Sequence, residues 1–476
     1  METPLPQASA IAGWLERSAF YEERVGSRSY ESNRFYHRLL RERYCFLVPP
    51  GAKALEIGCG LGDLLAAVRP VRGVGIDFSG KTIALARQRH PEIEFHVGDA
   101  GGRGIEEKFD YILLSDLIND LADVQNVFEK LQSMAHSDTR LVLNFLNTLW
   151  RPFLGMAEIC GGKAPSPPQN WLSTDDVVNL LQLTGWETVK VEQRILWPIN
   201  TPVIGNLLNR WLAPILSHLC LTIFIVARPK TAAPQEQQHR CSVVVPVRNE
   251  AGNIEAVVQR TPRLGLETEL IFVEGHSSDD TWSEIQRVAR AYPEAGIKAL
   301  QQQGRGKGDA VREGFSAATG ELLFILDGDL TVAPEELPKF YEIMRKGSAE
   351  FANGARLVYP MQQEAMRFLN MIANKLFGLA FSWLLGQRIK DTLCGTKVLW
   401  RRSYESIAKG RECFGDLDPF GDFDLLFGAA RLNLRIADVP VRYAARTYGE
   451  TNIRRWQHGW LLLRMVLLAA RKLKFR

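Results

Sequence analysis

Three glycines in equal steps, preceded by one acid, form the first pattern in this sequence that could bind a ligand. Gly58, Gly60 and Gly62 follow the apolar stretch that contains Glu56. Glycine has no β-carbon, so the backbone can turn sharply and approach a ligand closely. A Gly-x-Gly-x-x-Gly loop that opens a helix suits the pyrophosphate of NAD. The equal gaps and the acid instead favour a ligand that carries positive charge, such as S-adenosylmethionine (SAM) with its ammonium and sulfonium groups.

A second pattern pairs two carboxylates after a buried strand. Asp327 and Asp329 flank one glycine directly behind the apolar run at 322–326. Two carboxylates side by side repel each other unless a cation lies between them. A divalent cation, Mn²⁺ or Mg²⁺, could be held there and could also bind both phosphates of a nucleotide diphosphate. We therefore predict that Asp327 and Asp329 are metal ligands.

Polar residues also end three other predicted strand–loop units of the same half. Pro246, Arg248 and Glu250 follow the strand at 241–247, and Glu274 and Asp279 follow the strand at 270–274. Lys307 lies among Gly304, Gly306 and Gly308 at the start of a predicted helix. With the two aspartates they form four loops in order, which predicts a nucleotide-sugar site.

These loops need a scaffold that brings strand ends together. Apolar strands alternate with helical stretches from 52 to 230, and the alternation restarts after a stretch rich in Pro, Gln and Ala. This alternation predicts an α/β fold with two doubly wound domains. We expect a helical N-terminal extension at 1–50, a Rossmann-like domain at 51–230, a linker at 231–240 and a second domain at 241–476.

The first half resembles the class I SAM-dependent methyltransferase family, whose first motif is E/D-x-G-x-G-x-G. The resemblance covers about 52–230 and implies that Asp77 binds the ribose and Asp99 the adenine amine. It also places Asp116 at the end of the fourth strand, as a further SAM-binding residue. Asp116 and His136 are the two candidates for a methyl-transfer base.

The second half resembles family 2 glycosyltransferases with the GT-A fold, of the dolichyl-phosphate-mannose-synthase type. The resemblance implies that Glu250, Glu274 and Asp279 contact the base and ribose, Lys307 the nucleotide, and Asp327 and Asp329 the pyrophosphate and metal. The chain departs from the family in two places. Glycine follows Glu274 where many members have a second acid, and Thr331 replaces a common glutamine.

The acceptor side of this half also resembles polyprenyl-phosphate transferases. Asp391 and Lys397 match one block, Asp422 and Asp424 match the next, and a loop with Arg446, Tyr448 and Gly449 matches a phosphate-gripping segment. We expect Arg446, Arg454 and Arg455 to hold an acceptor phosphate, and Asp391, Asp329 and Asp424 to be catalytic. A phosphate acceptor needs no strong base, whereas for a hydroxyl acceptor Asp391 would be the base.

Charge and hydropathy bear on the cellular setting. The 476 residues carry a net charge of +4, which argues against nucleic-acid binding. Residues 447–476 hold seven basic residues and one acid, a balance of +6. No run of eighteen uncharged apolar residues occurs, the odd, scattered cysteines fit a reducing compartment, and no secretory signal is visible. We expect a cytoplasmic protein that lies peripherally on the inner face of an anionic membrane.

Two helices are candidates for that contact. The stretch 365–386 places Arg367, Asn370, Asn374 and Ser382 on one polar stripe, and the helix from about 456 ends in basic residues. Each could pack on the protein core or lie in the bilayer interface. The chain is thus expected to be a bifunctional transferase that uses SAM and a nucleotide-sugar donor, with a lipid-linked or glycan acceptor. The alternative is that only one domain is active and the other is a binding or regulatory scaffold.

Overall fold

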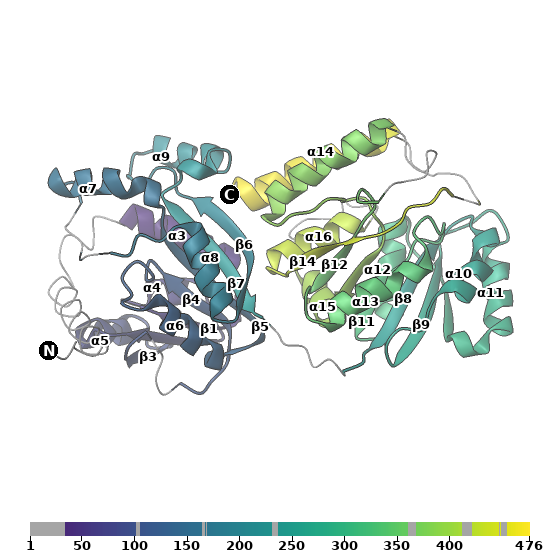
Figure 1. Ribbon diagram of the computed structural model, residues 1–476, viewed down its shortest axis with the longest axis horizontal. Helices are drawn as coiled ribbons and strands as arrows, with labels where there is room; N and C mark the ends of the chain where they lie inside the picture. The colour runs from purple at the N-terminus through teal and green to yellow at the C-terminus, as the bar shows by residue number, and fades with distance from the viewer. Residues whose placement is uncertain are drawn as a thin grey trace, which may run out of the picture. The chain divides into compact units, whose positions relative to one another are not determined.

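The computed structural model describes residues 34–100, 105–163, 167, 169–230, 237–359, 368–411, 421–446, 448 and 455–476. The chain separates into two compact units, one of Met1–Lys230 and one that takes in nearly all of the chain from Thr231 onwards. Each unit contains its own sheet, with helices packed around it (Figure 1). The predicted α/β fold with two doubly wound domains is confirmed.

The first unit is built on a seven-stranded sheet. Its strands are β1 (Lys53–Ile57), β2 (Arg72–Asp77), β3 (Glu94–Val97), β4 (Phe109–Ser115), β5 (Ala135–Leu146), β6 (Trp186–Arg194) and β7 (Thr222–Pro229). They lie in the order β3-β2-β1-β4-β5-β7-β6. β1 to β5 are parallel, whereas β7 runs antiparallel to both β5 and β6. The chain order reverses at β1, which has β2 on one side and β4 on the other, and open α/β sheets bind ligands at such a switch point.

Helices flank these strands in the chain. They are α3 (Arg34–Leu47), α4 (Asp63–Ala67), α5 (Gly80–Arg89), α6 (Val124–Leu131), α7 (Arg151–Ile159), α8 (Thr174–Leu183) and α9 (Ile204–Leu207). α6 buries Val127, Phe128 and Leu131 at helical spacing, in one core with strand residues of β1, β4 and β5. α8 begins with a capping box, because the Ser173 side chain accepts from Asp176 while the Asp176 side chain accepts from Ser173.

The second unit also has seven strands. They are β8 (Arg240–Val247), β9 (Glu267–Glu274), β10 (Ile297–Gln301), β11 (Leu322–Ile325), β12 (Phe351–Ala355), β13 (Lys397–Trp400) and β14 (Ile436–Pro440). The order is β10-β9-β8-β11-β13-β12-β14, and β13 is antiparallel to both of its neighbours. β8 is the switch point here, since β9 and β11 flank it in parallel.

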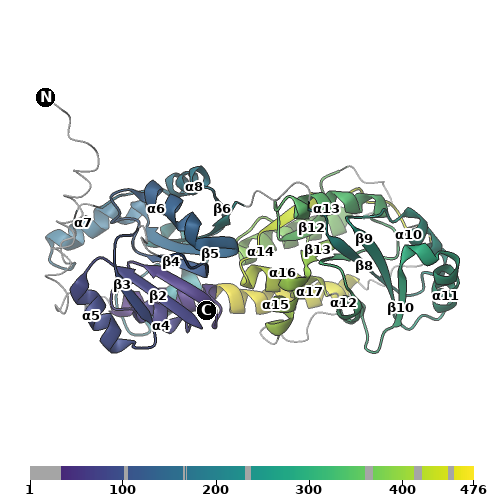
Figure 2. The same ribbon diagram turned by 90° about the horizontal axis from the view of Figure 1, so that it is seen from below.

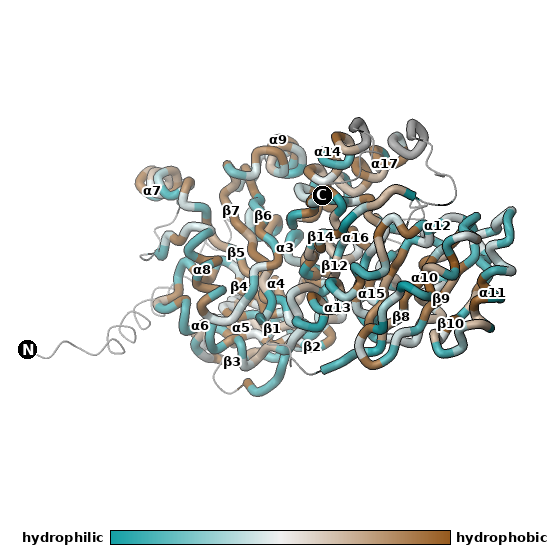
Figure 3. Tube along the Cα trace, turned by 45° about the vertical axis from the view of Figure 1, so that its right-hand side comes forward, coloured by the Kyte–Doolittle hydropathy of each residue, from teal (hydrophilic) through white to brown (hydrophobic). Residues whose placement is uncertain are grey.

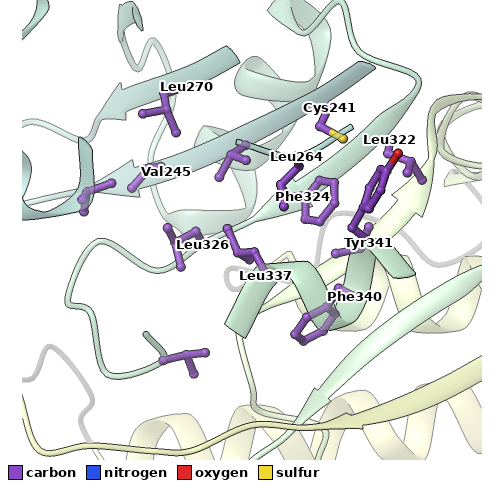
Figure 4. Close-up of a cluster of buried hydrophobic side chains, with 14 of the residues drawn as sticks. Cys241, Val245, Leu264, Leu270, Leu322, Phe324, Leu326, Leu337, Phe340 and Tyr341 are labelled. Atoms are coloured by element: carbon purple, nitrogen blue, oxygen red, sulfur yellow. The ribbon is translucent and has the colours of Figure 1, made fainter. Parts of the chain in front are cut away.

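Helices lie on both faces of the second sheet (Figure 2). They are α10 (Ile254–Arg260), α11 (Thr281–Ala291), α12 (Lys307–Ala317), α13 (Leu337–Arg345), α14 (Phe368–Leu385), α15 (Arg401–Lys409), α16 (Asp422–Arg431) and α17 (Arg455–Ala469). α13 adds Leu337 and Phe340 to a core that contains Val245 and Phe324 (Figure 4). α12 covers the opposite face, where a β-carbon at Gly314 would overlap Val244. Both cores leave the carboxyl ends of the parallel strands for polar loops.

Candidate functional site

The glycine loop of the first unit makes a tight turn between β1 and α4. Gly58, Gly60 and Gly62 have φ angles of 71°, 52° and 77°, a region that other residues rarely adopt. A β-carbon at Gly62 would lie 2.5 Å from the Phe95 ring. The N–H groups of Gly58 and Cys59 both donate to the Ile76 carbonyl, 2.8 and 3.0 Å away, which fastens the loop to β2.

Two acids face this loop, and their settings differ. The Asp77 carboxylate accepts from the backbone N–H of Gly60 at 3.0 Å and of Ser79 at 2.9 Å. Glu56 is buried, and its Oε2 has no hydrogen-bond partner in the described part of the chain. Burial raises the pKa of Glu56 well above its ordinary value. The loop therefore holds one buried acid with unused acceptor capacity.

Asp99 and Asp116 lie at the same edge of the sheet. Asp99 is half-buried two residues after β3, and Asp116 directly follows β4 with a φ of 52°. Because β3, β2, β1 and β4 are neighbours and parallel, the predicted SAM-binding residues all lie at one carboxyl edge. His136 lies at the opposite edge, where its Nε2 is 3.1 Å from Asp110. Of the two candidate bases, only Asp116 is at the edge of the glycine loop.

Asp116 has partners that the sequence did not suggest. The Tyr36 hydroxyl donates to its Oδ1 at 2.9 Å, and the Asn144 amide donates to the same atom at 2.5 Å. The Tyr44 hydroxyl in turn donates to Asn144 at 2.8 Å. Burial raises the pKa of Asp116 to about 6, although these hydrogen bonds lower it. The two tyrosines lie eight residues apart on α3.

The second unit gathers its acids and bases into a connected cluster. The Lys307 ammonium lies 2.6 Å from Asp327 Oδ1, and Arg446 reaches Asp329 Oδ2 at 2.7 Å and Glu250 Oε1 at 3.1 Å. Burial alone would lower the pKa of Lys307, but the Asp327 and Asp422 carboxylates raise it above its ordinary value. Each predicted metal-binding aspartate therefore has a cationic partner.

Backbone approach makes this cluster compact. A β-carbon at Gly395 would overlap both Asp327 and Lys307, and one at Gly421 would lie 2.6 Å from the Gly308 Cα. Lys397 is fully buried and pairs with Asp422 at 3.1 Å. Asp422 is also one of the carboxylates that raise the pKa of Lys307. Asp422 thus belongs to the cluster, whereas Asp424 pairs with Arg411 at 2.6 Å.

The loop with Arg446 is held in place by the chain that follows Asp329. The Ala444 N–H donates to the Thr331 carbonyl at 2.9 Å, and Val332 forms an antiparallel bridge with Tyr443. The Thr331 hydroxyl and N–H both donate to Asp329 Oδ1, at 2.8 and 3.1 Å. Thr331 therefore orients the second aspartate. Arg454 lies outside the described residues, as do Gly449 and the side chain of Arg455.

Other predicted donor-binding residues join the loops to one another. Pro246 lies in β8 opposite Val273, and Arg248 is exposed just beyond that strand. Asp279 Oδ2 accepts from the Ala251 N–H at 3.3 Å, which links the loops after β8 and β9. Glu274 ends β9 and accepts from the Ser277 N–H.

Asp391 is enclosed rather than open to a substrate. Its side chain is fully buried, and Arg356 binds both of its oxygens, at 2.7 Å from Nε and 3.0 Å from Nη2. Asn374 and the Leu393 N–H also donate to Oδ1, each at 3.0 Å. Burial would raise the pKa of Asp391, but Arg356 lowers it below its ordinary value. Arg356, which no local motif marks, also packs over the Tyr443 ring. Burial would raise the pKa of Asp327, but Lys307 lowers it below its ordinary value, with smaller contributions from Lys397 and Arg356.

Two family profiles match separate parts of the chain. Residues 49–164 match the methyltransferase domain profile, and residues 242–407 match glycosyl transferase family 2. A dolichol-phosphate mannosyltransferase of Pyrococcus furiosus is 28% identical over 221 residues, which are 45% of this chain and 59% of the relative. An undecaprenyl-phosphate 4-deoxy-4-formamido-L-arabinose transferase of Enterobacter sp. is 34% identical over 221 residues, 45% of this chain and 63% of that protein. The match thus spans about three fifths of each relative.

Solved structures resemble each half separately. A SAM-dependent methyltransferase of Thermotoga maritima matches 46% of this chain and 100% of its own, with a TM-score of 0.35 and 17% identity. Glucosyl-3-phosphoglycerate synthase of Mycobacterium tuberculosis matches 49% of this chain and 80% of its own, with a TM-score of 0.37 and 21% identity. The two profile matches, rather than these structures, identify the domains. The chain carries two transferase domains, a methyltransferase at 49–164 and a family 2 glycosyl transferase at 242–407.

Proposed function

We propose that the second unit transfers a sugar, with inversion, from a nucleotide-sugar donor to the phosphate of a polyprenyl phosphate. The observation that carries this proposal is the cluster in which Lys307 and Arg446 pair with Asp327 and Asp329. It combines two cations that can bind a diphosphate with two carboxylates that can bind a metal. The relatives named for transfer to dolichol phosphate and undecaprenyl phosphate support this class of acceptor.

The residues present fit a divalent cation. Mg²⁺ is commonly bound through one or two carboxylates together with substrate phosphates, and Asp327 and Asp329 supply two carboxylates in one loop. A bound Mn²⁺ or Mg²⁺ would neutralise charge on the departing nucleoside diphosphate. Lys307 would contribute positive charge on the Asp327 side, and Arg446 would do so beside Asp329 and Glu250.

The acceptor phosphate needs orientation more than deprotonation. Its oxygen forms the bond to the anomeric carbon while the bond from that carbon to the diphosphate oxygen breaks, and the electron pair leaves with the nucleoside diphosphate. Arg356 and Arg446 both lie beside the carboxylate cluster and can bind phosphate oxygens. Since both Asp391 oxygens are engaged, we assign Asp391 to the positioning of Arg356.

For the first unit we propose methyl transfer from SAM. The glycine loop leaves room for close backbone approach, Asp77 retains acceptor lone pairs for hydroxyl groups, and buried Glu56 offers an unpaired oxygen to a cationic group. SAM would supply a methyl group on a sulfonium. In this arrangement Asp77 and Asp99 hold the nucleoside, and Asp116 lies where it can contact the cofactor or accept a proton.

The second unit has a surface that fits a membrane. On α14, Asn374 faces inward and donates to Asp391, and Ser382 donates to the Ile389 carbonyl at 3.0 Å. α14 exposes the large apolar side chains of Ile372, Leu376, Leu379 and Trp383, with Lys375 exposed among them. Asn374 and Ser382 of the predicted polar stripe thus face the protein, whereas Arg367 and the side chain of Asn370 lie outside the described residues. The large apolar side chains face outward, the reverse of an ordinary surface helix.

α17 continues this pattern. It buries Leu462 and Met465 but exposes Trp460, Leu463 and Leu467, with Arg464 and Arg471 exposed beside them. Among the helices that the structure describes, none is long and apolar enough to cross a bilayer. We propose that α14 and α17 lie in the interface of an anionic membrane, on its cytoplasmic face, where the enzyme would serve cell-envelope glycan or glycolipid synthesis.

A donor screen tests the proposed sugar transfer. The purified protein, undecaprenyl phosphate in detergent and Mn²⁺ are incubated with a panel of nucleotide sugars, and release of nucleoside diphosphate is measured. We expect release that depends on the acceptor with at least one donor, and incorporation of the sugar into the lipid. Release of nucleoside diphosphate that a protein acceptor stimulates, but that undecaprenyl phosphate does not, would contradict the proposed acceptor.

A further inference from the structure

The methyltransferase unit carries an apolar surface that SAM binding does not explain. α7 has the sequence RPFLGMAEI, and none of its nine residues is buried. It exposes Phe153, Met156 and Ile159, of which Ile159 is 87% exposed. A helix of this composition ordinarily buries one face. Within the part of the chain that the structure describes, the outward side chains of α7 therefore lack the cover that their composition would ordinarily require.

A second segment extends the same surface. Residues 195–221, which join β6 to β7 and contain α9, expose nine large apolar side chains: Ile199, Val203, Ile204, Leu207, Trp211, Leu212, Ile215, Leu216 and Leu219. The two segments are joined by hydrogen bonds. The Asn147 N–H donates to the Leu221 carbonyl at 2.7 Å, and the Trp150 indole donates to the Leu219 carbonyl at 2.9 Å. Both segments contain brown, hydrophobic turns (Figure 3).

This surface lies at the edge of the sheet that holds the SAM site. β5 ends at Leu146, directly before the segment 147–163 that contains α7. The partner residue of Leu146 is Thr222, which begins β7 directly after the segment 195–221 that contains α9. The Tyr36 hydroxyl lies 3.3 Å from the Thr222 hydroxyl and donates to Asp116. Two hydrogen bonds therefore connect the candidate SAM site to the start of the apolar surface.

Charge and aromatic content favour one occupant. The segments 147–163 and 195–221 contain Arg151, Lys163 and Arg210 against Glu158, three minus one, or +2, and the second segment contains no acid. Trp150, Trp197 and Trp211 also lie in these segments. Exposed aliphatic side chains with tryptophan and basic residues at their border are typical of surfaces that lie in a bilayer interface. Ordinary transient protein interfaces are no more apolar than the rest of a protein surface.

We propose that α7 and the segment 195–221 dock on an anionic lipid bilayer, and that the methyl acceptor is a lipid-linked molecule that the bilayer presents to this edge. The inference concerns the acceptor, so it rests on the proposed methyl transfer from SAM. It adds a membrane contact that belongs to the methyltransferase unit itself. A bilayer-held acceptor would reach the edge with the glycine loop without leaving the lipid.

The chain offers a natural reporter for this surface. Cys160 is exposed one residue beyond α7, whereas Cys59, Cys220, Cys241 and Cys394 are buried. With Cys45 and Cys413 replaced by serine, an environment-sensitive fluorophore on Cys160 of the full chain reports on α7 alone. Vesicles that contain phosphatidylglycerol should shift its emission to the blue and raise it about twofold or more. Neutral phosphatidylcholine vesicles should give a smaller change, because anionic lipid attracts basic residues.

A matched pair of variants tests the surface itself. Ile204→Ser with Leu207→Ser removes two exposed apolar side chains from α9, and should reduce the vesicle affinity read by the Cys160 probe by about tenfold. Val71→Ser is the control, because Val71 is even more exposed than Ile204 and Leu207 but precedes β2 at the opposite edge of the sheet. The control should leave the probe response unchanged. SAM affinity, measured by calorimetry, should be unchanged in both variants if they are folded.

Three results would overturn the proposal. Vesicle-bound protein whose Cys160 probe does not respond would show that α7 stays in water. A probe signal that rises with protein concentration in the absence of lipid would identify a second copy as the occupant. Equal vesicle affinity of the α9 variant and the Val71→Ser control would exclude the segment 195–221. A wild-type chain that does not bind SAM would instead contradict the proposed methyl transfer. The Cys160 probe would still show whether α7 contacts the bilayer.

Discussion

Arg446 donates a hydrogen bond to Asp329 over 2.7 Å, although 117 residues separate them in the chain. The same guanidinium reaches Glu250 at 3.1 Å, so one cation joins the loop after β8 to the loop after β11. When a donor diphosphate and a metal bind, Arg446 can contact the diphosphate and Asp329 can contact the metal, instead of each other. The contact therefore predicts that Asp329 and Arg446 act on the same part of the donor.

Asp329→Ala should lower kcat for sugar transfer by about 100-fold or more, because a charged group aimed at the reacting diphosphate commonly contributes this much. Methyl transfer should be unaffected, since the two domains have separate cores. Thr331→Val is the matched control: it removes the hydroxyl that donates to Asp329 but keeps the carboxylate, and should cost less than tenfold. Excess EDTA should abolish sugar transfer, and undiminished transfer in EDTA would exclude the metal.

Asp77→Ala should weaken SAM binding more than tenfold, equivalent to about 1.4 kcal/mol or more. The variant loses the carboxylate that holds the Gly60 and Ser79 N–H groups and that is expected to bind the ribose. Asp110→Ala is the control, because Asp110 lies at the other edge of the same sheet. Calorimetry on the full chain measures both. Equal affinities for SAM would mean that Asp77 only supports the loop.

Local motifs predicted much of the fold and part of the site. The strands that end at or just before Asp77, Asp116 and Asp327 were found because each is a short apolar run that ends in a polar residue. In each of the two sheets, parallel pairing places such strand ends at one edge. The relevant information lies within about ten residues of each site. Lys307 was predicted in the same way, from glycines at a helix start.

Residues whose roles depend on distant contacts were not found. Tyr36 meets Asp116 across 80 residues, and Arg356 meets Asp391 across 35, so no local pattern marks either one. The polar stripe of α14 was recognised, but its direction was not, because Asn374 binds a buried carboxylate that only the folded chain brings to it. Periodicity shows which residues share a face, whereas tertiary contacts decide which face is inside.

Arg356→Lys tests whether Asp391 positions an acceptor-binding arginine. Lysine keeps the charge but cannot bind both Asp391 oxygens, so KM for the polyprenyl phosphate should rise about tenfold while kcat changes less. Asp391→Asn should behave alike, and the pH profile of kcat should stay the same. If Asp391 were the base, Asp391→Asn would lower kcat far more than Arg356→Lys, and the profile would lose its acidic limb.

Asp116 makes the stability of the first unit depend on pH. Its pKa is about 6 in the folded protein against 3.8 as the ordinary value, so the folded state binds more protons between these values. The free energy of unfolding should therefore fall as pH rises from about 4 to about 6. Because the carboxyl is only half-buried, we expect a loss of ~1 kcal/mol, less than the full shift would give.

Asp116→Asn should remove this loss of stability, because asparagine does not titrate. Its amide oxygen can still accept the hydrogen bond from Tyr36. In a urea titration, the transition of the first unit is the one that SAM shifts. The difference in midpoint between the variant and wild type should grow from pH 4 to pH 7. A constant difference over this range would show that Asp116 titrates normally.

The apolar stripe of α14 yields the last prediction. Leu376→Ser with Leu379→Ser removes two of its most exposed side chains, which are 61% and 70% exposed. Each leucine that enters lipid contributes roughly 1.5 kcal/mol or more, so the pair should lower vesicle affinity by about 100-fold in a flotation assay. Wild-type binding should also weaken with salt, because attraction of exposed Lys375 and Arg464 to the surface is screened.

Point substitution separates membrane contact from folding better than truncation of the C-terminus does. A chain cut after Arg455 would lose Leu462 and Met465, which are buried, and would therefore also lose stability. The α14 pair lies on the outer face and should leave the thermal midpoint and nucleotide release with a detergent-solubilised acceptor unchanged. Leu266→Ser, at an equally exposed site before β9, is the matched control. If the control lowers flotation as much as the α14 pair, the apolar stripe is not the membrane contact, and the exposed face of α17 becomes the segment to substitute.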